Sequence, residues 1–128
     1  MILSTEHINT LCASACPLIS PYDPEKNRGN PAKVELHLGR KCYCSNTPNK
    51  IYELSEDDAV EIEPNTIFLF ETQETFHFPE NLSGKMSLKM KYIAKGLLMP
   101  SQTQVDPGYK NVLFGMIYNL SSEKITLK

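Results

Sequence analysis

The chain of 128 residues has neither a long apolar run nor a strong excess of charge of one sign. Its longest apolar runs are far too short to span a bilayer. The start, Met1 to His7, lacks the basic stretch followed by an apolar run that marks a signal peptide. The formal net charge is -2 at pH 7, so nothing draws the whole chain to nucleic acid or acidic lipid. We therefore expect a cytoplasmic protein, with no nucleic-acid partner and no membrane segment within this chain.

The spacings that usually mark a metal site are also missing. The candidate ligands are four cysteines and three histidines: Cys12, Cys16, Cys42, Cys44, His7, His37 and His77. Neither cysteine pair has a two-residue spacer, and the histidines are scattered. Without a secretory signal a disulfide framework is disfavoured, so reduced structural thiols are favoured over a metal site or a disulfide. We expect His37 and His77 to be surface or interface residues without chemistry.

Repeats, low-complexity tracts and interdomain linkers are absent, and the length fits a single domain over residues 1–128. One helix is predicted over residues 4–14, with Ser4 as its N-cap. From Lys33 the apolar period becomes two, which predicts a strand at 33–38 that Gly39 ends. The runs 67–70 and 112–118 are apolar at successive positions, as in strands buried on both faces.

Further short strands are expected towards the end of the chain. Apolar residues alternate with lysines over 85–92, which predicts a strand with one apolar and one basic edge. Asp106-Pro107-Gly108 predicts a turn, and Ile125 begins a last strand. Many short strands separated by turns indicate an all-β sandwich or closed barrel.

Several segments, taken in order, resemble a known family. They are Met1-Ile2-Leu3-Ser4, Ile19 to Pro24, Asn30 to Gly39 with His37 in place of an arginine, Leu82 to Leu97, and Asp106-Pro107-Gly108-Tyr109 followed by Tyr118-Asn119. Together they resemble the dCTP deaminase branch of the trimeric dUTPase-like superfamily. The resemblance implies a mainly β fold, a distorted, jelly-roll-like β-barrel with one short N-terminal helix. It also implies a homotrimer with nucleotide sites at the subunit interfaces, and a deoxypyrimidine nucleotide as ligand.

The resemblance assigns chemistry to particular positions. In the deaminase branch an arginine and two serines bind phosphate and position water, and a glutamate is the general base. These positions fall on Lys89-Met90-Lys91 and on Met116. In the related dUTP hydrolases the aspartate at the Asp106 position activates water, with magnesium on the triphosphate. Methionine neither accepts nor donates a proton, and lysine meets phosphate only as a point charge.

We therefore predict a domain that has lost catalysis and serves as a nucleotide-binding module or a trimeric scaffold. The alternative is an active deoxynucleotide enzyme, a dCTP deaminase or a dUTP pyrophosphatase, that relies on Asp106. The predicted nucleotide-binding residues are Lys89, Lys91, Asp106 and Tyr109, and no cofactor is expected beyond magnesium carried by a nucleotide triphosphate.

Each of these residues also has a purely structural interpretation. Asp106-Pro107-Gly108 is a good turn in its own right, and Tyr109 is an aromatic residue at the start of a strand. Lys85, Lys89 and Lys91 are typical of a solvated strand face. A further expectation is that 1–128 is the N-terminal domain of a longer protein, with an effector or membrane segment after Lys128.

Overall fold

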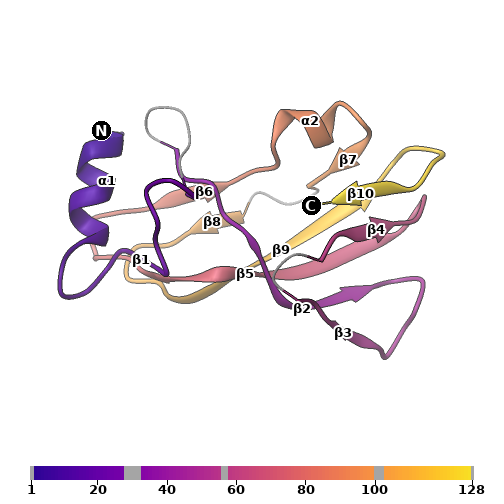
Figure 1. The fold of residues 1–128 in the computed structure, drawn as a ribbon, viewed down its shortest axis with the longest axis horizontal. Helices are drawn as coiled ribbons and strands as arrows, with labels where there is room; N and C mark the ends of the chain where they lie inside the picture. Colours follow the sequence, from indigo (N-terminus) through magenta and orange to yellow (C-terminus); the bar gives the residue numbers. More distant parts are fainter. Residues whose placement is uncertain (1, 28–32, 56–57, 100–102, 128) are drawn as a thin grey trace. The chain divides into compact units, whose positions relative to one another are not determined.

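The computed structural model describes residues 2–27, 33–55, 58–99 and 103–127, and it is mainly β, as predicted (Figure 1). The elements in chain order are α1 (Thr5–Cys12), β1 (Ile19–Ser20), β2 (Leu38–Cys44), β3 (Ile51–Glu53), β4 (Val60–Ile62), β5 (Ile67–His77), β6 (Gly84–Met86), α2 (Met90–Ile93), β7 (Leu97–Leu98), β8 (Thr103–Val105), β9 (Lys110–Asn119) and β10 (Ile125–Leu127). Among the described residues, neither helix is long and apolar enough to cross a membrane.

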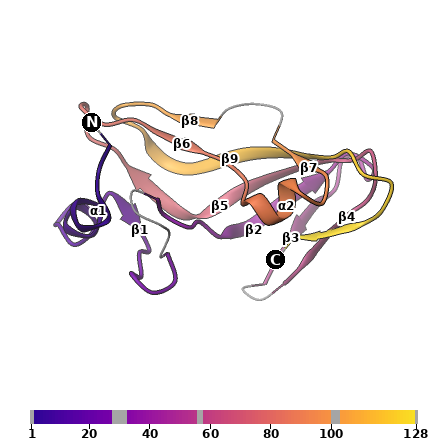
Figure 2. The ribbon, with the colours of Figure 1, turned by 90° about the horizontal axis from the view of Figure 1, so that it is seen from above.

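The largest sheet has the strand order β3-β2-β5-β9-β7, with β1 paired to β5. The pairs β10-β4 and β6-β8 form two small sheets. The residue contacts divide the chain into two compact units. The first unit comprises 1–38, 72–84 and 105–113, and the second comprises 39–71, 85–104 and 114–128. The two longest strands, β5 and β9, contribute residues to both units (Figures 1 and 2).

The first unit contains the predicted helix. The Ser4 side chain caps it by accepting a hydrogen bond from the His7 amide, and Ile8 and Cys12 are its buried residues. The helix prediction over 4–14 is thus confirmed, with the end at Cys12. Strand β1 then pairs antiparallel with β5, in a register that places Ile19 opposite Phe76. The buried side chains of both residues contribute to the core of this unit.

The second unit has its own core. Its fully buried apolar side chains are Ile62, Phe68, Leu97 and Ile117. The rings of Phe68 and Phe70 stack with centroids 5.9 Å apart. The predicted last strand is confirmed as β10, which pairs antiparallel with β4 and places Ile125 opposite Ile62.

The strand predicted at 33–38 is wrong. Strand β2 begins at Leu38, passes through the buried Gly39 and ends at Cys44. The amide of His37 donates a hydrogen bond to the carboxylate of Glu74. This amide therefore bonds to a side chain and not to the backbone of a neighbouring strand. Before β2, Val34 forms only an isolated bridge, and the continuous strand starts at Leu38.

The strand predicted over 85–92 is also wrong. Strand β6 ends at Met86, and Met90–Ile93 form the short helix α2. The Lys89 carbonyl accepts hydrogen bonds from the amides of Tyr92 and Ile93, which closes a helical turn. Met90 is exposed and Tyr92 is buried, whereas a strand would place both on one face.

The runs 67–70 and 112–118 are apolar at successive positions, but the rest of the chain buries only one face of each. In β5, Phe68 is 0% exposed and Leu69 is 40% exposed; in β9, Leu113 is 3% exposed and Phe114 is 58% exposed. Successive side chains of a strand point to opposite faces. The prediction of burial on both faces is therefore wrong for the single chain, and one face of these strands carries exposed apolar side chains.

Candidate functional site

The turn predicted at Asp106-Pro107-Gly108 is present in the first unit. The Tyr109 amide donates to the Asp106 carbonyl at 3.1 Å, and Gly108 has a φ of 79°, which glycine adopts without strain. The Gly108 amide in turn donates to the Pro79 carbonyl at 3.2 Å. The side chain of Asp106 is exposed at this turn, so its carboxylate faces solvent.

Tyr109 lies directly after this turn and is half-buried. Its hydroxyl donates to the carbonyl of Val112 at 2.5 Å, on the same strand. The Tyr109 ring is therefore held along β9, and the hydroxyl hydrogen is already used in a hydrogen bond. What Tyr109 still offers a ligand is the face of its ring and a lone pair of the hydroxyl oxygen.

Lys89 and Lys91 lie in the second unit, at the start of α2. Lys89 occupies the N-cap position, and the Lys91 ammonium lies 4.9 Å from the centroid of the Tyr92 ring. The backbone of Lys89 is extended, and the helix begins at the next residue, so Lys89 precedes the helix that contains Lys91. The prediction that Lys89 and Lys91 share one face of a strand is therefore wrong.

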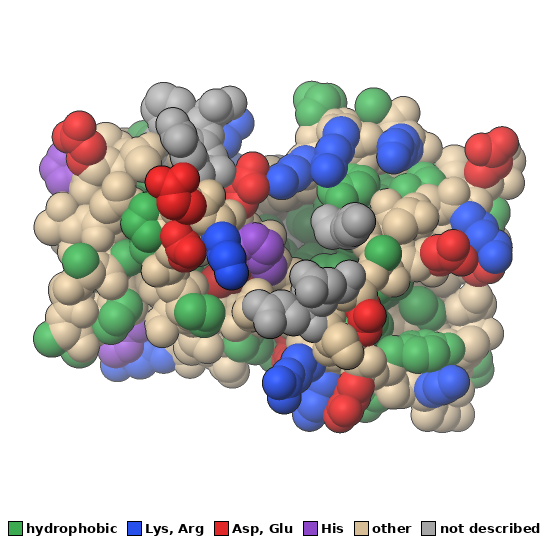
Figure 3. All heavy atoms as spheres, in the orientation of Figure 1, with side chains coloured by type: hydrophobic (Ala, Val, Ile, Leu, Met, Phe, Trp, Pro, Cys, Tyr) green, Lys and Arg blue, Asp and Glu red, His purple; other side chains and the backbone are tan. Residues whose placement is uncertain are grey.

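The segment 84–104 that contains α2 has four lysines and no acidic residue: Lys85, Lys89, Lys91 and Lys95. All four side chains are exposed. The local excess of positive charge therefore persists, although the predicted strand is absent. Figure 3 shows basic and acidic side chains interspersed on the face that it displays.

Met116 lies in β9, on the face opposite to the core of the second unit. A Cβ atom added to Gly115 would come within 2.4 Å of the Phe70 ring, so Gly115 faces that ring. Phe114 and Met116 alternate with Gly115 and point to the other face, and Leu69 alternates with Phe70 in the same way. We call Leu69, Phe114 and Met116 the outer face. This face offers no proton donor or acceptor at position 116.

The predicted site residues fall into two groups in the structure. Asp106 and Tyr109 share the turn in the first unit. Lys89, Lys91 and Met116 belong to the second unit, where Lys89 is the N-cap of α2, Lys91 lies within α2 and Met116 lies on β9.

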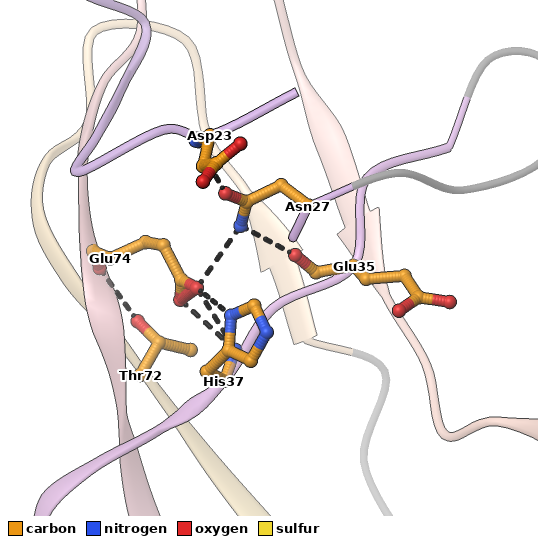
Figure 4. A network of polar contacts seen from close by, with 6 residues as sticks. All are labelled: Asp23, Asn27, Glu35, His37, Thr72 and Glu74. Atoms are coloured by element: carbon orange, nitrogen blue, oxygen red, sulfur yellow. Dashed lines mark hydrogen bonds and ion pairs between the residues drawn. The ribbon is translucent and has the colours of Figure 1, made fainter. Parts of the chain in front are cut away.

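Sequence reasoning missed a buried polar network in the first unit (Figure 4). Glu74 accepts hydrogen bonds from Asn27 and from the amide of His37, and the His37 ring lies 2.6 Å from its carboxylate. His37 is a surface residue, as expected, and its ring is paired with the buried carboxylate, a contact that the sequence did not indicate. One signal in the sequence could have pointed to this network. Thr72, Glu74 and Phe76 lie on one face of the strand, and the apolar Phe76 indicates that this face is buried.

The thiols are unpaired, and two of them are buried: Cys12 and Cys42. Burial, together with the neighbouring Cys44, raises the pKa of the Cys42 thiol to about 11, and burial also raises the pKa of Cys12. A raised pKa keeps a thiol protonated and unreactive at neutral pH. Within the part of the chain that the structure describes, no three histidine, cysteine or acidic side chains are grouped as metal ligands.

A family model described as dCTP deaminase-like matches residues 2–128. The chain belongs to the dCTP deaminase-like family. It is 32% identical over 111 residues to a dCTP deaminase of Pyrococcus horikoshii, a match that covers 87% of this chain and 67% of that protein. It is 28% identical over 142 residues to a dUMP-forming dCTP deaminase of Corynebacterium kroppenstedtii, covering 99% of this chain and 75% of that protein.

A solved structure shows the same fold. The 2'-deoxycytidine 5'-triphosphate deaminase of Agrobacterium tumefaciens superposes with a TM-score of 0.75 at 17% identity, over 99% of this chain and 44% of that one. The family resemblance and the dUTPase-like β fold expected from the sequence are thus confirmed. This dCTP deaminase-like chain spans about two thirds of the Pyrococcus relative and less than half of the structural match.

Proposed function

We propose that this dCTP deaminase-like domain binds a deoxypyrimidine nucleotide as a homotrimer and does not deaminate it by the family's glutamate-dependent route. The observation that carries the proposal is Met116, an apolar side chain on the outer face where the resemblance places the general base. General acid–base catalysis needs a group that exchanges a proton with the substrate, and a thioether has none.

The remaining features support binding. The acid-free segment around α2 supplies positive charge for a phosphate, with Lys89 and Lys91 as its central residues. Asp106 is exposed and accepts hydrogen bonds, so it suits a sugar hydroxyl, and the ring of Tyr109 offers an apolar surface. Magnesium enters this scheme only as part of the triphosphate ligand.

The second candidate is an active enzyme, and the identity to proteins named dCTP deaminase favours it. Its chemistry would rely on Asp106, the one acidic residue among the predicted site residues. Calorimetry with a panel of deoxynucleotides, combined with product analysis, separates the two candidates. Heat of binding without product supports the binding module, turnover that Asp106→Asn abolishes supports the enzyme, and no binding at all contradicts both.

Replacing both Lys89 and Lys91 by alanine should weaken binding of dCTP by roughly thirtyfold, since one ionic contact at 4 Å in water contributes about 1 kcal/mol. The wild-type affinity should also fall as salt rises through about 0.15 M, where the screening length is about 8 Å. Calorimetry at two salt concentrations checks both expectations.

The matched control is Lys41→Ala with Lys50→Ala. It removes the same charge, and Lys50 lies over the Tyr52 ring as Lys91 lies over Tyr92. Equal affinities of the two double variants would show that α2 has no special part in binding.

The protein should be a homotrimer, with a mass by light scattering of three times the 14.5 kDa of the chain. The exposed Leu69 and Phe114 support this, because exposed apolar patches mark association surfaces. Phe114→Asp should dissociate the trimer. Leu120→Asp changes an equally exposed leucine that follows β9 and should leave it intact. A monomeric mass for the wild type at micromolar concentration would contradict the expected assembly.

A further inference from the structure

The carboxylate of Glu74 has no part in the proposed nucleotide site, yet it is the centre of the polar network in Figure 4. Glu74 is 1% exposed. Its oxygens accept a hydrogen bond from Asn27 Nδ2 at 3.2 Å and from the His37 amide at 3.0 and 3.1 Å, and Oε1 lies 2.6 Å from His37 Nδ1. The backbone of one segment is thus bonded to a side chain of another.

The network joins three segments of the first unit. Asn27 is almost fully buried, and its Oδ1 accepts from the Asp23 amide at 2.8 Å. Its Nδ2 donates to the Glu35 carbonyl at 2.8 Å as well as to Glu74. The turn at 23–27, the segment 35–37 and strand β5 therefore meet at one carboxylate. We call Asn27, His37 and Glu74 the Glu74 latch.

A buried carboxylate is costly unless a positive group or hydrogen bonds compensate it. Of the described residues, His37 is the one titratable side chain in contact with this carboxylate. The other acidic or basic side chains drawn nearby are Asp23 and Glu35, and the Glu35 carboxylate points away from Glu74 (Figure 4). Both are acidic, so neither supplies a positive charge. The His37 side chain is 43% exposed, so protons from solvent reach it.

We propose that the Glu74 latch depends on the protonation of His37. A histidine changes its charge between about pH 5 and pH 8. A protonated ring adds the attraction between opposite charges to its hydrogen bond with the carboxylate, whereas a neutral ring keeps a hydrogen bond without that attraction. The latch is therefore tighter while His37 is protonated, and the segment 35–37 is released more often when the ring is neutral. The proposal is independent of nucleotide binding.

The test is amide hydrogen exchange of the whole chain at pH 6 and pH 8, corrected for the intrinsic exchange rates. The amides of Glu35 and His37 report on the latch, because each is bonded within it. In the wild type their opening should be up to about fivefold more frequent at pH 8, the effect expected from losing one ion pair with a partly exposed partner. Amides of the second unit should not follow this change.

Two variants decide the origin of the effect. His37→Arg keeps a positive charge at both pH values, so the pH difference should vanish. His77→Gln removes an exposed histidine from the same strand as Glu74 and should retain the full difference. Glu74→Gln removes the buried charge and should open the segment at both pH values. A pH difference that persists in His37→Arg, or that disappears in His77→Gln, would overturn the proposal.

Discussion

Replacing Asn119 by alanine is expected to lower the free energy of unfolding by about 3–5 kcal/mol. This residue is 0% exposed at the end of β9. Its Nδ2 donates to the carbonyls of Ile62 and Glu123 at 2.8 and 2.9 Å, and its Oδ1 accepts from the amide and hydroxyl of Ser121. Alanine removes the Asn119 partner from the buried carbonyl of Ile62 and from the amide of Ser121, and each such loss costs about 1–3 kcal/mol, whereas the Glu123 carbonyl keeps a hydrogen bond from the Ser121 hydroxyl. Chemical denaturation of the purified protein measures the loss.

Asn111→Ala is the matched control for this substitution. Asn111 lies on the same strand but is exposed, and its side chain accepts one hydrogen bond, from the amide of Val112. Exposed changes of this kind usually alter stability by less than about 0.5 kcal/mol. If the two variants unfolded at the same denaturant concentration, the network around Asn119 would not stabilise the second unit.

The elements that sequence reasoning predicted are those set by neighbouring residues. Helix α1 has its N-cap, its apolar stripe and its end within a few residues, and the Asp106 turn is defined by its own proline and glycine. The errors arose where distant residues decide. Strand β2 starts late because Glu74 binds the amide of a residue 37 positions earlier in the chain.

The candidate site also has a part that the sequence predicts and a part that it does not. The order of the segments was sufficient to predict the family, whereas the assignment of Met116 and Lys89 to the positions of its chemistry stays a prediction. Side-chain directions were not predictable, because they depend on the local backbone. The helical turn at α2 replaces the strand on which Lys89 and Lys91 were expected to lie, and the hydrogen bond of Tyr109 to Val112 uses a donor that the sequence left open.

Purified protein should release ammonia from dCTP at a rate about a hundred- to ten-thousandfold below that of an active dCTP deaminase, the usual cost of losing a general base. The protein of Pyrococcus horikoshii, 32% identical to this chain, is a suitable positive control. The physical reason is that Met116 has no group that takes a proton from water or delivers one to the cytosine ring. A coupled ammonia assay with chromatography of the nucleotide products measures the rate.

Three variants separate the causes of such inactivity. Met116→Ala should match the wild type, because neither side chain moves a proton. Met116→Glu should not restore turnover on its own, since Lys89-Met90-Lys91 would still replace the arginine and the two serines that hold phosphate and water in the resemblance. Ammonia release by the wild type clearly above that of Met116→Ala would show that Met116 does not occupy the base position. Release that Asp106→Asn abolishes would instead assign the chemistry to the turn, and the domain would be an enzyme whose base lies outside β9.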